Sequence, residues 1–481
     1  MPFALEGAPL ATYGSRVIGL RTILLALAVA LAAAPVAAAE TYRVTRTGDP
    51  APGACLPNDC SLREAGLAAN ASVGVADTIV LPGRGPYNLP RFGEDDGAML
   101  GDLDVSNDAL RVVHPGKGRA VIDAGGLDRV FHVFAGAPLT LEKLVVRDGN
   151  AVGAQGYGGG VRAAARLRII RTHVLSNLAA QCGGGIHTQD GAALVLDRAR
   201  VAGNRAVSDG GGISASCFGS GGRLTMTRST VSGNVSDSDN NDIGRGGGIY
   251  LQTNAAIQST ITTSTWSGNR AGDEGGAIYT DLGKLRITRT TINGNRAGDL
   301  GGGIEVDGTE PLVVVNSTIT GNRSDANGGG ISLDSGEVSL NGVTVVRNRG
   351  NADGVLSEAG GGLYVDTGEV FRIANSLVAL NTLAPLVAGQ PPVKNDCAGE
   401  VDSGGGNLIT SRFLCDGFDA VRDRRARNPR LGKLRANGGP TRTVALLARS
   451  PAINGARASA PSRDQRGVRR VKPDSGAFER R

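Results

Sequence analysis

The sequence predicts an all-β protein, a right-handed parallel β-helix with a cap at each end, and three observations predict it. A glycine-rich phrase recurs at intervals of 26 to 35 residues. An asparagine stands at one phase of each repeat, and apolar residues hold fixed positions around it. Because such a repeat buries its apolar face only against the next repeat, this period indicates a solenoid. The right-handed rule for parallel crossovers sets the expected handedness.

The asparagine column is the first predicted element. Parallel strands of successive coils lie about 4.8 Å apart, so identical amides at one phase stack and bond to each other. The column therefore predicts a structural ladder made of Asn177, Asn204, Asn234, Asn269, Asn295, Asn322, Asn348 and Asn381.

Apolar residues mark three short strands in each repeat. An apolar residue stands eight residues before each ladder asparagine, and another stands three residues before it. A third follows the glycines, as Ile304 does in "GGGIEVDG". Alternation such as "LRIT" has the strand period, and glycines suit the sharp bend between strands. These columns predict coils over residues 100–385.

The first 39 residues predict a cleaved export signal. Arg16 and Arg21 precede the apolar run "TILLALAVALAAAPVAAA", and small residues end it. A membrane anchor is the alternative, but the run is short for a span of about 20 residues. We expect an exported protein that is secreted, periplasmic or at the cell surface, with no transmembrane segment after signal removal.

The cysteines and the two ends of the repeat complete the predicted architecture. An even number of cysteines in an exported chain favours disulfides. We expect residues 40–99 to enter and cap the coils, and residues 386–481 to close the far end, since a bare strand edge recruits other chains. Pairing by proximity, one of many possible connectivities, joins Cys55 to Cys60, Cys182 to Cys217 and Cys397 to Cys415.

Three segments resemble families of exported bacterial proteins. "CSLREAGLAAN" at residues 60–70, followed by "ADTIVLPGRGPYNL", resembles the CSLREA-type N-terminal segment, with Gly66 where that family usually has Ile. The "GN…GGGI" coils resemble the polymorphic outer membrane protein repeat. The stretches "NPRLGKLRANGGPTRTVALLARSPAINGA" and "DQRGVRR…DSGAFE" resemble the choice-of-anchor Q domain. The resemblance implies a pectin lyase-like β-helix at the surface or in the medium, and no particular activity.

The sequence names no catalytic residue. The β-helix class hosts lyases, hydrolases and adhesins, so the fold does not select an activity. The histidines are scattered, and we expect His173 and His187 to face solvent on neighbouring coils, with a role as site residues as the alternative. We therefore favour a monomeric, adhesin- or matrix-type protein that binds a glycan or another surface partner, and no nucleic acid. The alternative is a polysaccharide lyase or hydrolase that acts on acidic polysaccharide, so enzyme activity stays open.

An arginine stripe is the first candidate binding site. Arg270, Arg296 and Arg323 each follow a ladder asparagine, so we expect them to stack along one edge of the coils. Such a stripe would attract an acidic polysaccharide. The alternative is that the arginines pair with aspartates of the same bend, which are Asp273, Asp299 and Asp325.

Long loops at the same bend supply the second candidate. Two coils, 234–249 and 348–363, carry six extra residues there, which predicts two walls on one side of the stack. The first contains "SDSDNND", in which Asp237, Asp239 and Asp242 offer the hard oxygen ligands that Ca²⁺ prefers. A solvated acidic loop is the alternative, and Ca²⁺ is the one cofactor that the sequence suggests.

Overall fold

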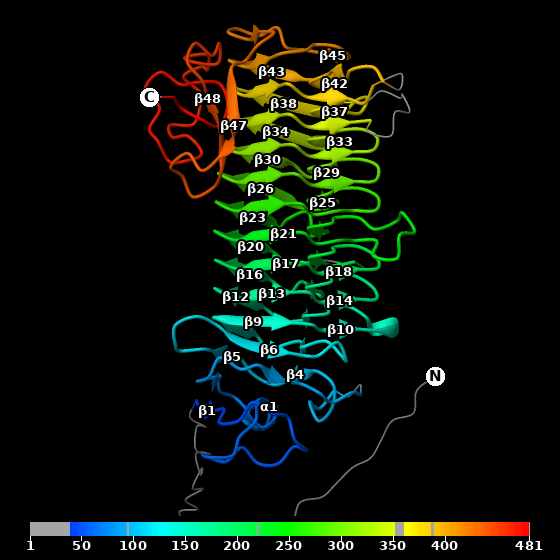
Figure 1. Cartoon of the computed structure of the whole chain (residues 1–481), viewed down its shortest axis with the longest axis vertical. Helices are drawn as coiled ribbons and strands as arrows, with labels where there is room; N and C mark the ends of the chain where they lie inside the picture. The colour runs from blue at the N-terminus through cyan, green and yellow to red at the C-terminus, as the bar shows by residue number, and fades with distance from the viewer. Residues whose placement is uncertain are drawn as a thin grey trace, which may run out of the picture. The chain divides into compact units, whose positions relative to one another are not determined.

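Alternating apolar residues form short strands that stack on their counterparts in the next coil. The computed structural model describes residues 39–93, 96–217, 219, 221–351, 360–385 and 389–480. Within them the chain winds as a right-handed parallel β-helix (Figure 1), which confirms the predicted fold class. Each coil passes through sheet 1, sheet 2, a short strand, and then sheet 3. The expected signal, residues 1–39, lies almost entirely outside the described residues.

Three long sheets form the walls of the helix. Sheet 1 contains 13 strands in the order β1 (Thr41–Arg43), β2 (Asp77–Val80), β5 (Leu110–Val113), β8 (Leu139–Glu142), β12 (Leu167–Ile170), β16 (Leu194–Asp197), β20 (Leu224–Thr227), β23 (Gln258–Thr262), β26 (Lys284–Thr288), β30 (Leu312–Val315), β34 (Glu337–Asn341), β38 (Val370–Ala374) and β43 (Asp402–Gly405). Sheet 2 contains 13 strands in the order β3 (Tyr87–Asn88), β6 (Ala120–Asp123), β9 (Leu144–Arg147), β13 (His173–Leu175), β17 (Arg200–Ala202), β21 (Thr230–Ser232), β24 (Thr265–Ser267), β27 (Thr291–Asn293), β31 (Thr318–Thr320), β35 (Thr344–Val346), β39 (Leu377–Ala379), β44 (Leu408–Ile409) and β46 (Arg424–Arg425). Sheet 3 contains 12 strands in the order β4 (Leu103–Val105), β7 (Phe131–Val133), β11 (Val161–Ala163), β15 (Ile186–Thr188), β19 (Ile213–Ala215), β22 (Ile249–Leu251), β25 (Ile278–Thr280), β29 (Ile304–Asp307), β33 (Ile331–Ser335), β37 (Leu363–Val365), β42 (Cys397–Glu400) and β45 (Cys415–Asp416).

Short strands line the bend between sheets 2 and 3. They form a three-stranded and a five-stranded sheet, called sheet 4 together, and a separate hairpin follows near the C-terminus. The strands of sheet 4 are β10 (Asn150–Ala151), β14 (Leu178–Ala179), β18 (Arg205–Ala206), β28 (Arg296–Ala297), β32 (Arg323–Ser324), β36 (Arg349–Gly350), β40 (Thr382–Leu383) and β41 (Val393–Lys394). The hairpin consists of β47 (Leu431–Arg435) and β48 (Thr443–Leu446).

The ladder asparagines are buried and bond from coil to coil. The side-chain oxygen of Asn295 accepts both the backbone N–H and the side-chain amide of Asn269, each at 2.9 Å. The amide of Asn295 also donates to the carbonyl of Trp266 at 3.2 Å. The ladder ends on Asp396, whose carboxylate accepts from Asn381 at 3.0 Å. An aspartate thus takes the last ladder position, which the asparagine column did not predict.

The coils continue beyond residue 385, the boundary set from the sequence. β42, β43 and β44 extend all three long sheets in parallel register, and β45 and β46 follow. The glycine phrase is lost there, but an acceptor at the Asp396 position and alternating apolar residues still satisfy the stacking requirement.

Glycines stand where a side chain has no room. Gly301 has φ +61°, in the left-handed region that favours glycine. A Cβ atom on Gly302 would lie 2.3 Å from the carbonyl carbon of Arg323. The repeated glycine phrase therefore serves the close approach of one bend to the next.

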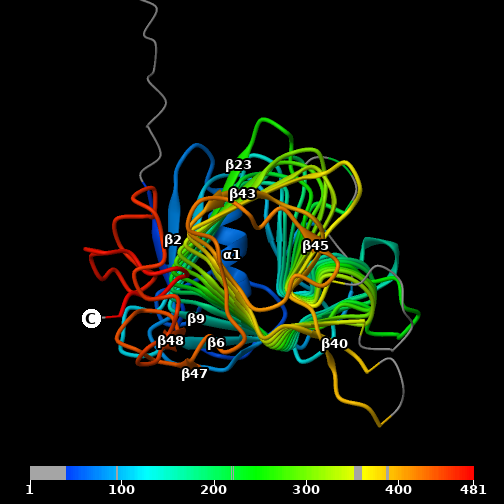
Figure 2. The same cartoon turned by 90° about the horizontal axis from the view of Figure 1, so that it is seen from above.

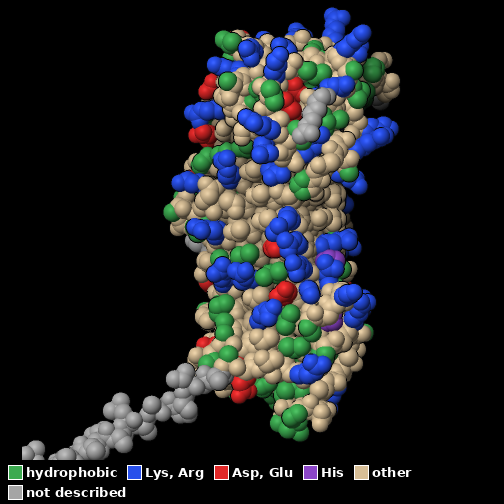
Figure 3. All heavy atoms as spheres, turned by 90° about the vertical axis from the view of Figure 1, so that its left-hand side faces the viewer, with side chains coloured by type: hydrophobic (Ala, Val, Ile, Leu, Met, Phe, Trp, Pro, Cys, Tyr) green, Lys and Arg blue, Asp and Glu red, His purple; other side chains and the backbone are tan. Residues whose placement is uncertain are grey.

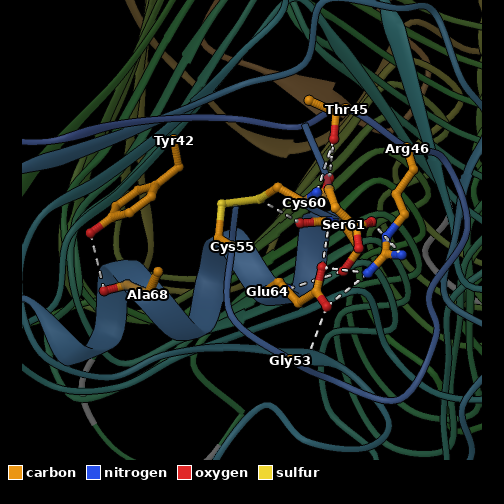
Figure 4. Close-up of a disulfide and its surroundings, with 10 residues drawn as sticks. Tyr42, Thr45, Arg46, Gly53, Cys55, Cys60, Ser61, Glu64 and Ala68 are labelled. Carbon is orange, nitrogen blue, oxygen red and sulfur yellow. Dashed lines mark hydrogen bonds and ion pairs between the residues drawn. A yellow bond between two sulfur atoms is a disulfide. The ribbon is translucent and has the colours of Figure 1, made fainter. Parts of the chain in front are cut away.

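The helix α1 (Leu62–Ala71) lies at the N-terminal end of the coils (Figure 1). Ser61 caps it and accepts from the N–H of Glu64, while the Glu64 carboxylate accepts from the N–H of Ser61 at 2.7 Å. Cys55 and Cys60 form a disulfide beside this cap, and Arg46 bonds to Glu64 (Figure 4). Within "CSLREA", Leu62 and Ala65 join the core. The motif therefore stabilises the N-terminal end of the β-helix.

The C-terminal segment, residues 427–480, lies along the side of the coils rather than over their open end alone (Figures 1 and 2). Gln465 is fully buried there and donates to Thr291 at 3.0 Å and accepts from Thr318 at 2.6 Å, both on sheet 2. A separate apolar cluster joins Leu377 and Leu408 of sheet 2 to Leu446. Residues 421–481 contain 17 Lys or Arg and 4 Asp or Glu, and Figure 3 shows basic side chains over this face.

Two further disulfides join Cys182 to Cys217 and Cys397 to Cys415, as pairing by proximity predicted. Among the described residues, no helix has the length and apolar character needed to cross a membrane.

Candidate functional site

The outward face of sheet 3 carries a column of side chains that does not repeat. The first and third residues of each strand point into the core, and the middle residue points away from it. These middle residues lie in register from coil to coil, in the order Asp104, His132, Arg162, His187, Ser214, Tyr250, Tyr279, Glu305, Ser332 and Tyr364. We call this set the outer column.

A pocket of about 660 Å³ opens at the N-terminal end of the outer column. Carboxylates, guanidinium groups, amides and one aromatic ring line it together. The lining residues are Asp96, Asp102, Asp128, Arg129, His132, Phe134, Ala135, Gln155, Arg162, Ala164 and Gln189. We call it the N-terminal pocket.

A buried ion pair forms one wall of this pocket. The Arg129 guanidinium contacts the Asp102 carboxylate, and it also donates to the carbonyl of Tyr157 at 3.0 Å. Burial raises the pKa of Asp102, and Arg129 opposes that rise. Because both side chains are buried, the pair is fixed in place and shapes the wall.

Arg162 crosses the pocket floor in a network of planar groups. It donates to the Gln189 side chain at 3.0 Å and to the Gln155 side chain at 2.7 Å. Its guanidinium lies 5.6 Å from the ring centre of Tyr157, and that ring lies 5.0 Å from the ring of His187. Arg162 is half-buried, so part of its guanidinium faces the pocket.

His187 is 4 % exposed, which corrects the expectation that it faces solvent. Its side chain does leave the core, but Tyr157 and the neighbouring bend cover it. Burial lowers the pKa of His187 to about 3. His173 lies half-buried on sheet 2, away from the outer column, and burial lowers its pKa to about 4.

His132 stands between the carboxylates and the arginines. Its Nδ1 lies 3.4 Å from an Asp104 oxygen, and its ring centre lies 4.1 Å from that of Phe134. Burial lowers the pKa of His132 to about 4, so its imidazole is neutral near pH 7. Asp96, Asp104 and His132 place possible ligand atoms within 4.8 Å of one another, a spacing that a divalent cation fits.

The N-terminal cap holds this pocket in shape through Arg63. Arg63 is 0 % exposed and its guanidinium donates to the carbonyls of Leu100, Gly101 and Asp102 at 2.7 to 3.0 Å. It also pairs with Asp49 at 2.9 Å. The fourth residue of "CSLREA" therefore fixes the backbone that presents Asp102 to the pocket.

The predicted arginine stripe is in register on sheet 4. Arg270, Arg296 and Arg323 follow one another across the short strands. Arg296 and Arg323 both pair with Asp325, at 2.7 and 3.1 Å, and their side chains are 46 % and 40 % exposed. Two of the three therefore pair with an aspartate, Arg323 with that of its own bend and Arg296 with that of the next coil. Arg270 is exposed, with no carboxylate within 4.0 Å among the described residues.

The three aspartates of the long loop do not form a ligand cluster among the described residues. Asp237 is buried and its carboxylate accepts from the N–H of Asn241 at 2.6 Å. Asp239 accepts from the Asn241 amide, and Asp242 is exposed. The second long loop, expected as the other wall, includes residues 352–359, which lie outside the described residues.

A larger hollow of about 1,030 Å³ lies near the C-terminal end of sheets 1 and 3. Its charged lining is mostly acidic, with Asp366, Glu369 and Asp402 among them and Arg412 as the one base. It contains no histidine, so it lacks the mixed groups of the N-terminal pocket.

Sequence reasoning missed the N-terminal pocket because its members come from six separate segments of the chain. The outer column left one signal: the residue after each "GGGI"-type position changes from coil to coil, while the residue before it stays apolar. A position that varies inside a regular repeat is where a solenoid can place function.

Comparisons with known proteins identify the fold and no more. No family model and no curated protein matches the chain. A crystal structure of pectate lyase Pel9A superposes with a TM-score of 0.50 at 14 % identity, covering 93 % of this chain and 98 % of that one. This likeness supports the β-helix architecture, and the three sequence resemblances stay predictions.

Proposed function

We propose that the protein is an exported β-helix protein that binds an acidic polysaccharide in the N-terminal pocket. One observation carries the proposal: Arg129, Arg162, His132, Gln155 and Gln189 meet carboxylates and the Phe134 ring around one hollow on the outside of the coils. Pockets that bind ligands combine an apolar wall with a few convergent polar groups.

Each group has a part in such binding. The exposed side of Arg162 would pair with a uronate carboxylate, because guanidinium and carboxylate match in a bidentate pair. Asp128 and the two glutamine amides would bond to sugar hydroxyls, and the Phe134 ring would pack against a sugar face. Export is supported by three disulfides, which form in oxidising compartments, and by the resemblance of residues 60–70 to exported proteins.

A titration of sized oligouronates from pectate, alginate and hyaluronan tests this binding by calorimetry. Arg162→Gln should weaken binding at least tenfold. Arg168→Gln is the matched control, because Arg168 lies in the same coil on sheet 1, away from the pocket. Equal affinity in both variants, or no binding by the wild-type chain, would reject the proposal.

A second candidate function, polysaccharide lyase, is favoured by His132. A lyase needs a neutral base beside a group that neutralises the uronate carboxylate. His132 lines the same pocket as two guanidinium groups, those of Arg129 and Arg162. In that reaction His132 would take the proton from the carbon next to the carboxylate, the bond from the neighbouring carbon to the glycosidic oxygen would break as a double bond forms, and the departing oxygen would take a proton from solvent water.

The two functions separate in one assay. Polymer incubated with the wild-type chain is followed by the ultraviolet absorbance of unsaturated uronate ends. A steady rise that His132→Gln abolishes would establish the lyase. New reducing ends without that absorbance would indicate a hydrolase, and binding without either product leaves the adhesin or matrix role.

A further inference from the structure

The C-terminal segment, residues 427–480, presents charge of one sign at its surface. Every exposed charged side chain in this segment is an Arg or a Lys. Its three acidic residues are all buried, since Asp464 is 0 % exposed, Asp474 is 1 % exposed and Glu479 is 6 % exposed. Figure 3 shows basic side chains gathered over the upper part of this face. The segment therefore projects a positive field that would attract an anionic partner.

The buried acids are used inside the segment, and the exposed bases are not paired with them. The Asp464 carboxylate pairs with Arg466 at 2.7 Å. The Glu479 carboxylate pairs with the buried Arg470 at 3.3 Å and accepts from the N–H of Asp474 at 2.9 Å. Among the described residues, no exposed base of this segment lies within 4.0 Å of a carboxylate. These positive charges therefore stay available to a partner.

The hairpin of β47 and β48 separates an apolar inner face from a basic outer face. Leu431 and Leu434 pack inward against the apolar cluster beneath the hairpin. Lys433 and Arg435, on the same strand, are exposed, and so is Arg442 just before β48. Within the described part of the chain, the side chains of these three bases make no ion pair and no hydrogen bond. The fold therefore does not need their charge.

Exposed apolar side chains lie among these bases. Leu447, which directly follows β48, is 48 % exposed, and a Cβ atom on Gly432 would lie 3.8 Å from it. The N–H of Leu447 donates to the carbonyl of Arg430, another exposed base. Val471 is 84 % exposed and stands next to the exposed Lys472. Apolar contact and attraction to anionic lipids together drive binding to a membrane surface.

We propose that the C-terminal segment binds the surface of a membrane that contains anionic phospholipids. Phosphate headgroups suit the exposed bases, because guanidinium pairs with phosphate in a bidentate geometry and each base near such a surface adds to the attraction. Leu447 enters the headgroup layer beside them. The apolar side chains favour a lipid surface over a soluble polyanion, which has no apolar layer to receive them. The N-terminal pocket lies toward the other end of the coils (Figure 1), so this contact leaves the pocket accessible.

Sedimentation with phosphatidylcholine vesicles, with and without phosphatidylglycerol, tests this binding independently of the polysaccharide site. Protein recovered after export is used, because the apolar run of the expected signal would itself bind lipid. We expect it to sediment with the vesicles that contain phosphatidylglycerol and to be released by added salt, since ions screen exposed charges. The triple change Lys433→Gln, Arg435→Gln and Arg442→Gln should weaken this binding at least tenfold.

A matched control removes the same charge from the other side of the coils. Arg270→Gln, Arg296→Gln and Arg323→Gln together change the stripe on sheet 4, which lies across the coils from the C-terminal segment (Figure 2), and should leave vesicle binding unchanged. Equal losses in the two triple variants would overturn the proposal. So would equal binding to the two kinds of vesicle, or no binding by the wild-type chain.

A soluble polyanion is the other occupant that the charge would admit, and Leu447 separates it from a lipid surface. Leu447→Ser should weaken vesicle binding and leave the binding of inorganic polyphosphate unchanged. An equal effect on both ligands, or on neither, would overturn the choice of a lipid partner, as would polyphosphate binding without vesicle binding.

Discussion

The outer column is open at its N-terminal end and closed in the middle, although the backbone repeats from coil to coil. At the N-terminal end, His132 and Arg162 border a pocket of about 660 Å³. In the middle, Tyr250 stacks on Tyr279, and Glu305 is buried under its own bend. The comparison shows that the coil frame is set by inward side chains, while the outward position is free to differ.

Burial favours neutral side chains in both regions, which gives the buried histidines and the buried glutamates pH dependences of opposite sign. In the N-terminal region burial lowers the pKa of His132 and His187, so the histidines are neutral. In the middle region burial raises the pKa of Glu274 to about 7 and that of Glu305 well above its ordinary value. Burial of the histidines therefore lowers stability as the pH falls below 6.5, and burial of the glutamates lowers stability as the pH rises above 4.5.

The largest expected effect comes from the residue that supports the N-terminal pocket. Arg63→Met leaves the buried Asp49 carboxylate and the carbonyls of residues 100–102 without their donor. Breaking a buried pair from one side costs about 3–5 kcal/mol. Urea unfolding followed by circular dichroism measures the loss in the free energy of unfolding.

Arg111→Met is the control for this change. Arg111 pairs with Glu142 on the surface, with 48 % of its side chain exposed, so its loss should cost less than about 1 kcal/mol. Equal effects of the two changes would show that the cap does not fix the pocket wall.

The buried Glu305 carboxyl group should give an effect of intermediate size on how stability depends on pH. Glu305 holds its proton in the folded chain above the pH at which the unfolded chain loses it. Stability should therefore fall as the pH rises above the ordinary value of 4.5, by at most about 1.4 kcal/mol per pH unit for this group. Glu305→Gln removes this pH dependence. In EDTA, the free energy of unfolding of the variant should therefore rise relative to that of the wild-type chain between about pH 5 and pH 8.

His187→Gln should show the opposite sign. The unfolded chain takes up a proton below the ordinary histidine pKa of 6.5, while the folded chain stays neutral until about 3. Wild-type stability should therefore fall as the pH drops through that window, and the variant should lack this loss. Unfolding curves at a series of pH values measure how the difference in free energy of unfolding between each variant and the wild-type chain changes with pH. If this difference changes with pH in the same direction for Glu305→Gln and His187→Gln, the comparison is contradicted.

The smallest expected effect on stability belongs to the arginine stripe. Arg296 and Arg323 share Asp325 on the surface, so Arg270→Gln, Arg296→Gln and Arg323→Gln together should change the free energy of unfolding by about 1 kcal/mol or less. Retention on an acidic-polysaccharide column should also change little if the N-terminal pocket is the binding site. Retention lost at unchanged stability would instead assign binding to the stripe.

The sequence predicted the inward half of this molecule well. Stacking forces like residues onto like, so columns such as Ile278, Ile304 and Ile331 were visible as repeats and are buried as expected. The end of the ladder on Asp396 was hidden because an aspartate replaces the expected asparagine. The placement of the C-terminal segment along sheet 2 was hidden as well, since it depends on long-range contacts such as Gln465 with Thr318.

The candidate sites depend on the outward half, where nothing repeats. Asp102 and Arg162 lie 60 residues apart in the sequence, and only the coil register brings them to one pocket. The buried state of Glu305 and His187 follows from how bends stack over the outer column, which glycine positions alone do not reveal. The sequence predicted the arginine stripe because those arginines recur in the repeat. It did not predict which of several aspartates would form the ion pairs, and the structure shows that Arg296 and Arg323 share Asp325.

A crystal structure of the protein with a short oligouronate would show directly where the sugar binds. We expect sugar density in the N-terminal pocket, with a carboxylate against Arg162 and hydroxyls against the Gln189 and Gln155 amides. The pocket should stay empty in Arg162→Gln crystals soaked at the same concentration. Density along Arg270, Arg296 and Arg323, or a sugar bound equally well by the Arg162→Gln variant, would contradict it.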